Sequence, residues 1–200
     1  MLGIGTGTSV AKPGVLNATR IVIQSCFFLF AGTTAHALTV AELAKDASLT
    51  PRTFAHHFAN FRFRFDPKVQ QPDAFLSARA GDCDDYAILA ARVLKSRGFT
   101  PRLISVRMPH EVDVVCYVEE VEGYLDFNER KSGDGIVRCA NSLETIAAKV
   151  TGSFDAEWEY VCEFVYRDGV KRLVRGVNPK NREASAKPSN RNQSQKAARS

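Results

Sequence analysis

The spacing of apolar residues changes along the chain, from a helical period to the alternation of strands. Phe54, Phe58 and Phe61 recur at helical spacing, which predicts a segment that packs on the core. Apolar residues at i, i+1, i+4 and i+7 predict a buried helix over residues 83–97, which Gly98 would end. Further helices are expected over residues 38–45, after a start at Ser48-Leu49-Thr50-Pro51, and over 142–150 behind a Ser142 cap.

From Pro101 onward the apolar residues alternate with polar ones, as strands require. Arg167-Asp168-Gly169 has the composition of a tight hairpin turn. Strands are expected over residues 102–107, 112–119, 124–128, 157–165 and 170–177. Helices first and antiparallel strands second predict an α+β fold.

Positive charge is concentrated at the C-terminus. Residues 178–200 hold six basic residues against Glu183, which accounts for the whole net charge of +5. We therefore expect a basic, disordered tail that makes a weak, salt-sensitive contact with anionic surfaces or only keeps the chain soluble. No specific nucleic-acid surface is expected, since the alternation of Phe61 to Phe65 predicts a half-buried strand with Arg outward.

The N-terminal segment has the pattern of a cleavable secretory signal. Lys12 and Arg20 precede an apolar run over residues 21–30, and Ala35-His36-Ala37 fits an A-x-A cleavage site. The run is short for a bilayer span. This predicts a signal peptide over 1–37, a folded domain over 38–177, a secreted or periplasmic location and no stable membrane insertion after cleavage. The alternatives are an uncleaved anchor or a misassigned start.

Four cysteines follow the predicted cleavage site: Cys83, Cys116, Cys139 and Cys162. An exported compartment permits disulfides. If Cys83 is a free nucleophile, at least one of the other three is unpaired, and the sequence does not assign partners.

The segment Asp82-Cys83-Asp84-Asp85 carries the strongest chemical signal, because it sits where a glycine turn becomes a helix. A thiolate there is favoured by the helix dipole and is a better nucleophile than a thiol. A cysteine hydrolase also needs an imidazole and a group that orients it. His110 and Asp126 are the candidates, since His56 and His57 are read as surface or structural histidines.

Over roughly residues 60–130 the chain resembles the transglutaminase-like superfamily, in particular its bacterial cysteine-peptidase-like members. The resemblance rests on Gly81 to Ala87, the helix after it, and the strands from Leu103 to Asp126. It implies a papain/transglutaminase-like core in which the helix bearing the nucleophile packs on an antiparallel sheet. Carried over, Cys83 would be the nucleophile, His110 the general base and acid, and Asp126 the group orienting His110.

Two features depart from that pattern. In the family the histidine directly opens its strand, whereas here Asp113 precedes the apolar run and His110 lies three residues earlier. If Asp113 takes the histidine's place, the base is lost. In addition, a two-residue turn at Val121-Glu122 would put Asp126 opposite Tyr117, which leaves Asn128 as the reserve orienting residue.

The aspartates beside Cys83 raise an electrostatic objection, because like charge disfavours a thiolate. Asp84 and Asp85 are equally explained as helix-cap residues that match the dipole. Their spacing is too tight for a calcium loop, and zinc would need more Cys or His nearby. We therefore expect no metal and no cofactor.

The sequence as a whole predicts an exported cysteine hydrolase that acts on a peptide or carboxamide bond through a Cys83–His110–Asp126 triad and a thioester. Its partner would be a protein or peptide substrate. Amine transfer is a less favoured outcome of the same chemistry. The alternative is a catalytically degenerate transglutaminase-like domain that binds proteins or has a structural role.

Overall fold

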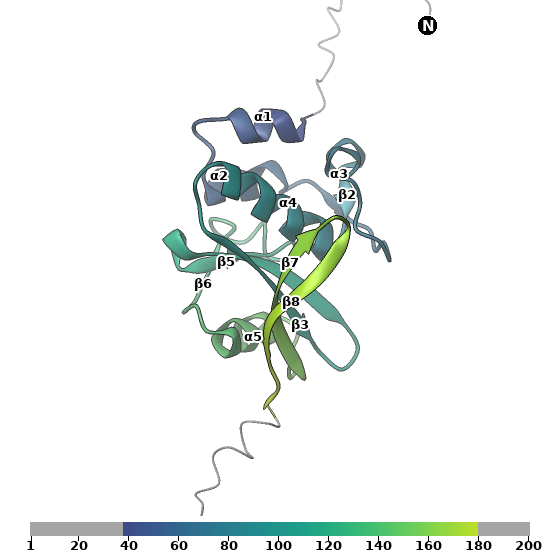
Figure 1. Cartoon of the computed structure of the whole chain (residues 1–200), viewed down its shortest axis with the longest axis vertical. Helices are drawn as coiled ribbons and strands as arrows, with labels where there is room; N and C mark the ends of the chain where they lie inside the picture. Colours follow the sequence, from purple (N-terminus) through teal and green to yellow (C-terminus); the bar gives the residue numbers. More distant parts are fainter. Residues whose placement is uncertain (1–37, 180–200) are drawn as a thin grey trace, which may run out of the picture. The chain divides into compact units, whose positions relative to one another are not determined.

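The computed structural model describes residues 38–179 (Figure 1). The predicted signal peptide over 1–37 and the predicted tail from residue 180 lie outside the described residues. The first half contains α1 (Val40–Lys45), α2 (Pro51–His57), β1 (Arg62–Phe63), α3 (Pro72–Ala78), β2 (Ala80–Gly81) and α4 (Cys83–Ser96). The second half contains β3 (Pro101–Arg107), β4 (Val112–Val118), β5 (Gly123–Leu125), β6 (Val137–Arg138), α5 (Leu143–Gly152), β7 (Tyr160–Arg167) and β8 (Val170–Val177). The predicted α+β order is confirmed.

A six-stranded sheet forms the centre of the domain. Its strand order is β6-β5-β4-β3-β7-β8, and every neighbouring pair is antiparallel. The short strands β1 and β2 form a separate parallel pair that leads directly into α4. The start of α4 is therefore held by the β1–β2 pair and not by a strand of the main sheet.

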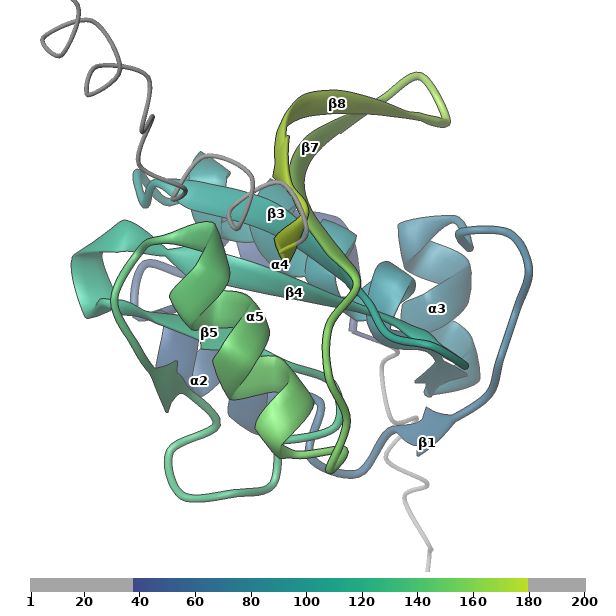
Figure 2. The same cartoon turned by 90° about the horizontal axis from the view of Figure 1, so that it is seen from below.

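Helices cover both faces of the sheet (Figure 2). Residues of α1 to α4 pack on one face in a core rich in aromatic rings, where Phe58 contacts Phe54, Phe61, Phe75 and Tyr86 at centroid distances of 4.7 to 5.7 Å. The helix α5 covers the other face. Because apolar strand residues point alternately to the two faces, both faces of β3 and β4 are buried.

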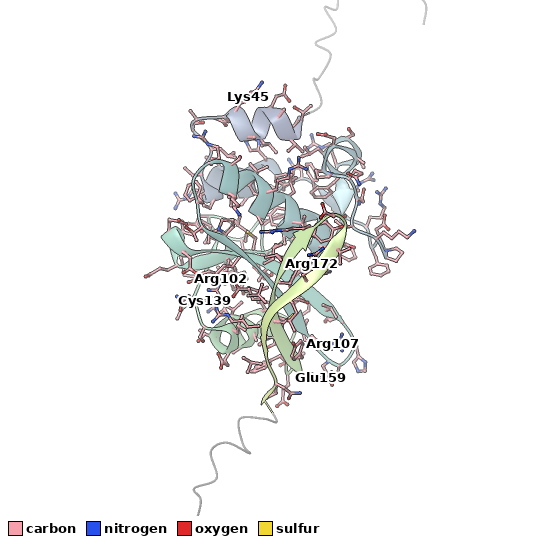
Figure 3. All side chains as sticks on the ribbon, viewed as in Figure 1. Lys45, Arg102, Arg107, Cys139, Glu159 and Arg172 are labelled. Atoms are coloured by element: carbon pink, nitrogen blue, oxygen red, sulfur yellow. The ribbon has the colours of Figure 1, made fainter. Side chains whose placement is uncertain are left out.

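The β7–β8 hairpin bends away from the rest of the sheet (Figure 2). Its turn is Asp168-Gly169, and both residues have positive φ, as a tight hairpin turn with matching twist requires. A register shift at Glu163/Phe164 adds to the bend. Figure 3 marks Arg172 on this hairpin and Arg102 on β3, where the Arg102 guanidinium pairs with Glu119 and Glu163 at 3.0 and 2.9 Å.

The prediction of a half-buried strand over Phe61 to Phe65 is wrong in its burial. Phe61 is buried, but Phe63 is 62% and Phe65 is 74% exposed, as are the arginines between them. The paired strand is only two residues long and hydrogen-bonds β2 rather than the main sheet. Alternation alone does not reveal whether any element covers the apolar face of a strand.

The register expected for a two-residue turn after β4 is also wrong. A short 3₁₀ helix, Glu119–Val121, lengthens the connection, so Val118 pairs with Gly123 and Tyr117 with Tyr124. Continued beyond β5, this register brings Asn128 to Asp113, and the two side chains are hydrogen-bonded.

We predict that Phe58→Ala lowers the free energy of unfolding by about 3–5 kcal/mol, because it leaves a cavity among four rings. Phe65→Ala is the matched control, since this side chain is exposed, and should change stability by less than about 0.5 kcal/mol. Urea unfolding of the two variants measures the difference. Equal losses would contradict the assignment of the aromatic core.

Candidate active site

The N-terminus of α4 is fixed by a reciprocal capping box. The carboxylate of Asp82 accepts a hydrogen bond from the Asp85 backbone N–H at 3.4 Å, and the carboxylate of Asp85 accepts one from the Asp82 N–H at 3.2 Å. Both side chains are buried. Cys83 is thereby set at the first helical position, as the sequence predicts, where backbone N–H groups are unpaired.

The same two aspartates hold the loop that precedes α3. The Asp66 N–H donates to Asp82 at 3.1 Å, and Gln70 donates its backbone and side-chain N–H groups to Asp85 at 2.6 and 2.7 Å. Gly81 is required here, since a Cβ at this position would lie 2.6 Å from a ring carbon of Phe75. Asp82 and Asp85 therefore have structural roles.

Asp84 has a different partner, which sequence reasoning missed. Lys171 of β8 reaches the carboxylate of Asp84 at 2.6 Å, across 87 positions of sequence. Its side chain is 41% exposed and that of Asp84 is 26% exposed. The ion pair ties the β7–β8 hairpin to the first turn of α4, and no local signal in the sequence could have indicated it.

The thiol of Cys83 faces the start of β4. Its Sγ donates a hydrogen bond to the carbonyl oxygen of Val112 at 3.8 Å, and the carboxyl group of Asp113 lines the same cavity. Burial raises the pKa of Cys83 well above its ordinary value, and the negative charges of Asp113, Asp84 and Asp82 raise it further. The resting site therefore favours a neutral thiol.

Behind the thiol lies a chain of polar groups. The Asn128 side-chain amide donates to the carboxyl group of Asp113 at 3.5 Å, and the Asn128 backbone N–H donates to Asp126 Oδ1 at 2.7 Å. Asp126 Oδ2 is buried and has no hydrogen-bond partner among residues 38–179. Burial raises the pKa of Asp113 and of Asp126, and the negative charge of Asp113 adds to the shift at Asp126.

Cys83 and His110 line one cavity of about 680 Å³. His110 is exposed in the turn between β3 and β4, and among the described residues no hydrogen bond joins it to Cys83. Asp126 lies beneath the site and does not line the cavity. The structure thus brings Cys83 and His110 to one cavity, which the buried carboxyl group of Asp113 also lines.

The four cysteines at positions 83, 116, 139 and 162 are free thiols. Within residues 38–179, no group of three or more histidine, cysteine or carboxylate side chains is arranged to hold a metal ion. None of the helices in this described range is both long and apolar enough to cross a membrane.

Residues 38–125 match the family model described as a transglutaminase-like domain. The matched region is fewer than half of the residues of the chain. The match confirms the resemblance recognised in the sequence. The comparison with curated proteins found no match.

Solved structures with detectable likeness include three of LapG from Legionella pneumophila. The calcium-bound form is 16% identical over 70% of this chain and 80% of that chain, with a TM-score of 0.42. The EGTA-treated form is 16% identical over 71% and 80%, with a TM-score of 0.44. A third structure is 17% identical over 74% and 82%, with a TM-score of 0.43.

We predict that stability falls as pH rises from about 5 to about 8. Because the pKa values of Asp113 and Asp126 are raised, the folded state binds more protons in this range than the unfolded chain does. The favourable contribution is complete below the ordinary carboxyl pKa and is lost as pH rises through the raised values. Asp126→Asn should reduce the loss by at least about 1 kcal/mol, measured by urea unfolding.

The control for this measurement is Asp168→Asn, since Asp168 is an exposed turn residue. It should keep the pH dependence of the wild type. A wild-type stability that rises over the same pH range, or an unchanged slope in Asp126→Asn, would contradict the protonation assigned to the buried pair.

Proposed function

We propose that the domain is a cysteine hydrolase that cleaves a peptide or carboxamide bond with Cys83 as the nucleophile. The observation that carries the proposal is the position of Cys83, at the capped N-terminus of α4 and on the wall of a cavity that His110 also lines. The family match supports the same class of protein. A protein or peptide is the substrate class that this chemistry requires.

In the proposed reaction, Cys83 Sγ attacks the carbonyl carbon while the thiol proton passes to a base. The base then gives that proton to the leaving amine, and a thioester remains. Water, deprotonated by the same base, hydrolyses the thioester and restores the thiol. Backbone N–H groups at the start of α4 would stabilise the negative charge on the carbonyl oxygen. Because the resting thiol is neutral, proton transfer must accompany attack.

His110 is the proposed base. It lies on the exposed turn at the cavity wall, so its ring has room to turn toward the thiol when substrate binds. Hydrogen bonds of a catalytic site are often incomplete before substrate binds. Asp126, proposed from the resemblance as the orienting group, would act from below the site, where it holds the backbone of Asn128.

A second candidate function is supported by Asp113. Its buried carboxyl group lines the cavity of the thiol at the strand opening, where the family resemblance implies a histidine. If Asp113 occupies that position permanently and His110 stays in solvent, the domain would bind a peptide without cleaving it. Such a degenerate domain would have lost the catalytic base but kept the cavity that binds the peptide.

Acylation by a p-nitrophenyl ester separates the two candidates. As a hydrolase, the wild type should acylate Cys83 faster than the half-buried Cys139 and Cys162, which serve as internal reference thiols. His110→Ala should slow acylation of Cys83 by about 100-fold or more, as expected for loss of a general base. Peptide mass spectrometry and nitrophenolate release measure both rates.

Acylation of Cys83 no faster than that of the reference thiols would overturn the hydrolase proposal in favour of the binding module. If acylation of Cys83 is fast, unchanged in His110→Ala and lost in Asp113→Asn, the hydrolase proposal stands and Asp113 is the base. Cys83→Ser controls for esters that react elsewhere on the chain.

Export also remains a proposal, supported by the N-terminal sequence pattern alone. We expect the mature protein in the secreted or periplasmic fraction to begin at Leu38, after cleavage behind Ala37. Intact-mass measurement of the protein from each fraction tests this. Recovery of the full-length chain only, in the cytosolic fraction, would argue against a cleavable signal.

A further inference from the structure

Apolar side chains crowd the rim of the cavity at Cys83. Phe63, Phe65 and Val112 are 62%, 74% and 47% exposed, and all three line this cavity. Within the described residues, the other large hydrophobic side chains with comparable exposure belong to the β7–β8 hairpin. A clustered apolar rim around a cavity is typical of a surface that binds a partner.

The polar lining of the same cavity is acidic. Lys171 is the one lysine or arginine in the described lining, and its ammonium group is committed to Asp84. A concave site lined by one sign of charge concentrates ligands of the opposite sign. The carboxylates of the lining are Asp66, Asp82, Asp84, Glu111 and Asp113.

This acidity is local to the cavity. The net charge of the chain resides in residues 178–200, so the preceding residues are neutral as a set. Four of the five carboxylates have partners within the chain: Asp82 caps α4, Asp84 pairs with Lys171, Asp113 contacts Asn128, and Asp66 Oδ1 accepts the Lys68 backbone N–H at 3.0 Å. Glu111 is exposed in the β3–β4 turn, and Asp66 is bound to a backbone N–H rather than to a cation, so these two carboxylates are the best placed to meet a ligand.

We propose that this cavity binds an extended peptide segment in which a lysine or arginine side chain faces Asp66 and Glu111 while apolar neighbours pack on Phe63 and Phe65. The inference rests on the proposed function for its ligand class, a peptide, and adds the side-chain chemistry that the cavity selects. Charge complementarity supplies the choice of cation, and the exposed rings supply the apolar contacts.

The test measures binding alone, in the full chain carrying Cys83→Ser, so that cleavage is not needed. Three fluorescein-labelled peptides of sequence Gly-Leu-Ala-X-Ala-Leu-Gly carry arginine, neutral citrulline or glutamate at X. Fluorescence anisotropy should give the arginine peptide a Kd about tenfold below that of citrulline, and the glutamate peptide the weakest binding. The preference should shrink as salt is raised.

Two variants locate the contacts. The double variant Asp66→Asn, Glu111→Gln should reduce the preference for arginine over citrulline by about threefold or more, with little effect on the citrulline peptide. Phe65→Ala should weaken all three peptides. The control Glu157→Gln removes an exposed carboxylate outside this cavity and should leave every Kd unchanged.

Equal affinity for the three peptides, or no binding of the arginine peptide, would overturn the proposal. So would an arginine preference that persists in the double variant. Binding with the expected preference but without acylation at Cys83 would uphold this inference and refute the hydrolase, whereas cleavage of all three peptides at equal rates by the wild type would do the reverse.

Discussion

The capping box at the start of α4 is the constraint on which the site depends. Two buried carboxylates, Asp82 and Asp85, bind each other's backbone N–H groups and also hold the loop from Asp66 to Gln70. This fixes the backbone of Cys83 against β4 and forms one wall of the cavity. Removing either carboxylate would free the helix start and the loop together. The two aspartates therefore position Cys83 and need take no part in its chemistry.

The same arrangement opposes ionisation of the thiol. Burial and nearby aspartates raise the pKa of Cys83, and one of these aspartates, Asp113, lines the same cavity. Lys171 neutralises Asp84 and offsets part of this charge. A hydrolase built on this frame must move a proton as substrate binds, and a binding module can leave the thiol neutral. Both uses share one acidic cavity with an apolar rim.

Local patterns predicted most of the fold. The spacing of apolar residues and the helix-cap residues predicted α4 from Cys83 and the strands β3, β4, β7 and β8. The composition of residues 167–169 predicted the turn at Asp168-Gly169. What sequence could not give depends on long-range pairing. The exposure of Phe63 and Phe65 depends on which element covers them, the β4–β5 register depends on a 3₁₀ turn, and the Lys171 contact joins residues 87 positions apart.

The sequence left two candidates for the position beside the thiol, His110 and Asp113. Both line the cavity, and the charge of the Asp113 carboxyl raises the pKa of Cys83. The most direct test is a ¹³C NMR titration of the Cys83 Cβ in wild type, Asp113→Asn and Asp113→His. We expect a wild-type midpoint above the ordinary thiol value of about 8.5, lowered by Asp113→Asn and lowered most by Asp113→His. A wild-type midpoint below that value, unchanged by either substitution, would contradict it.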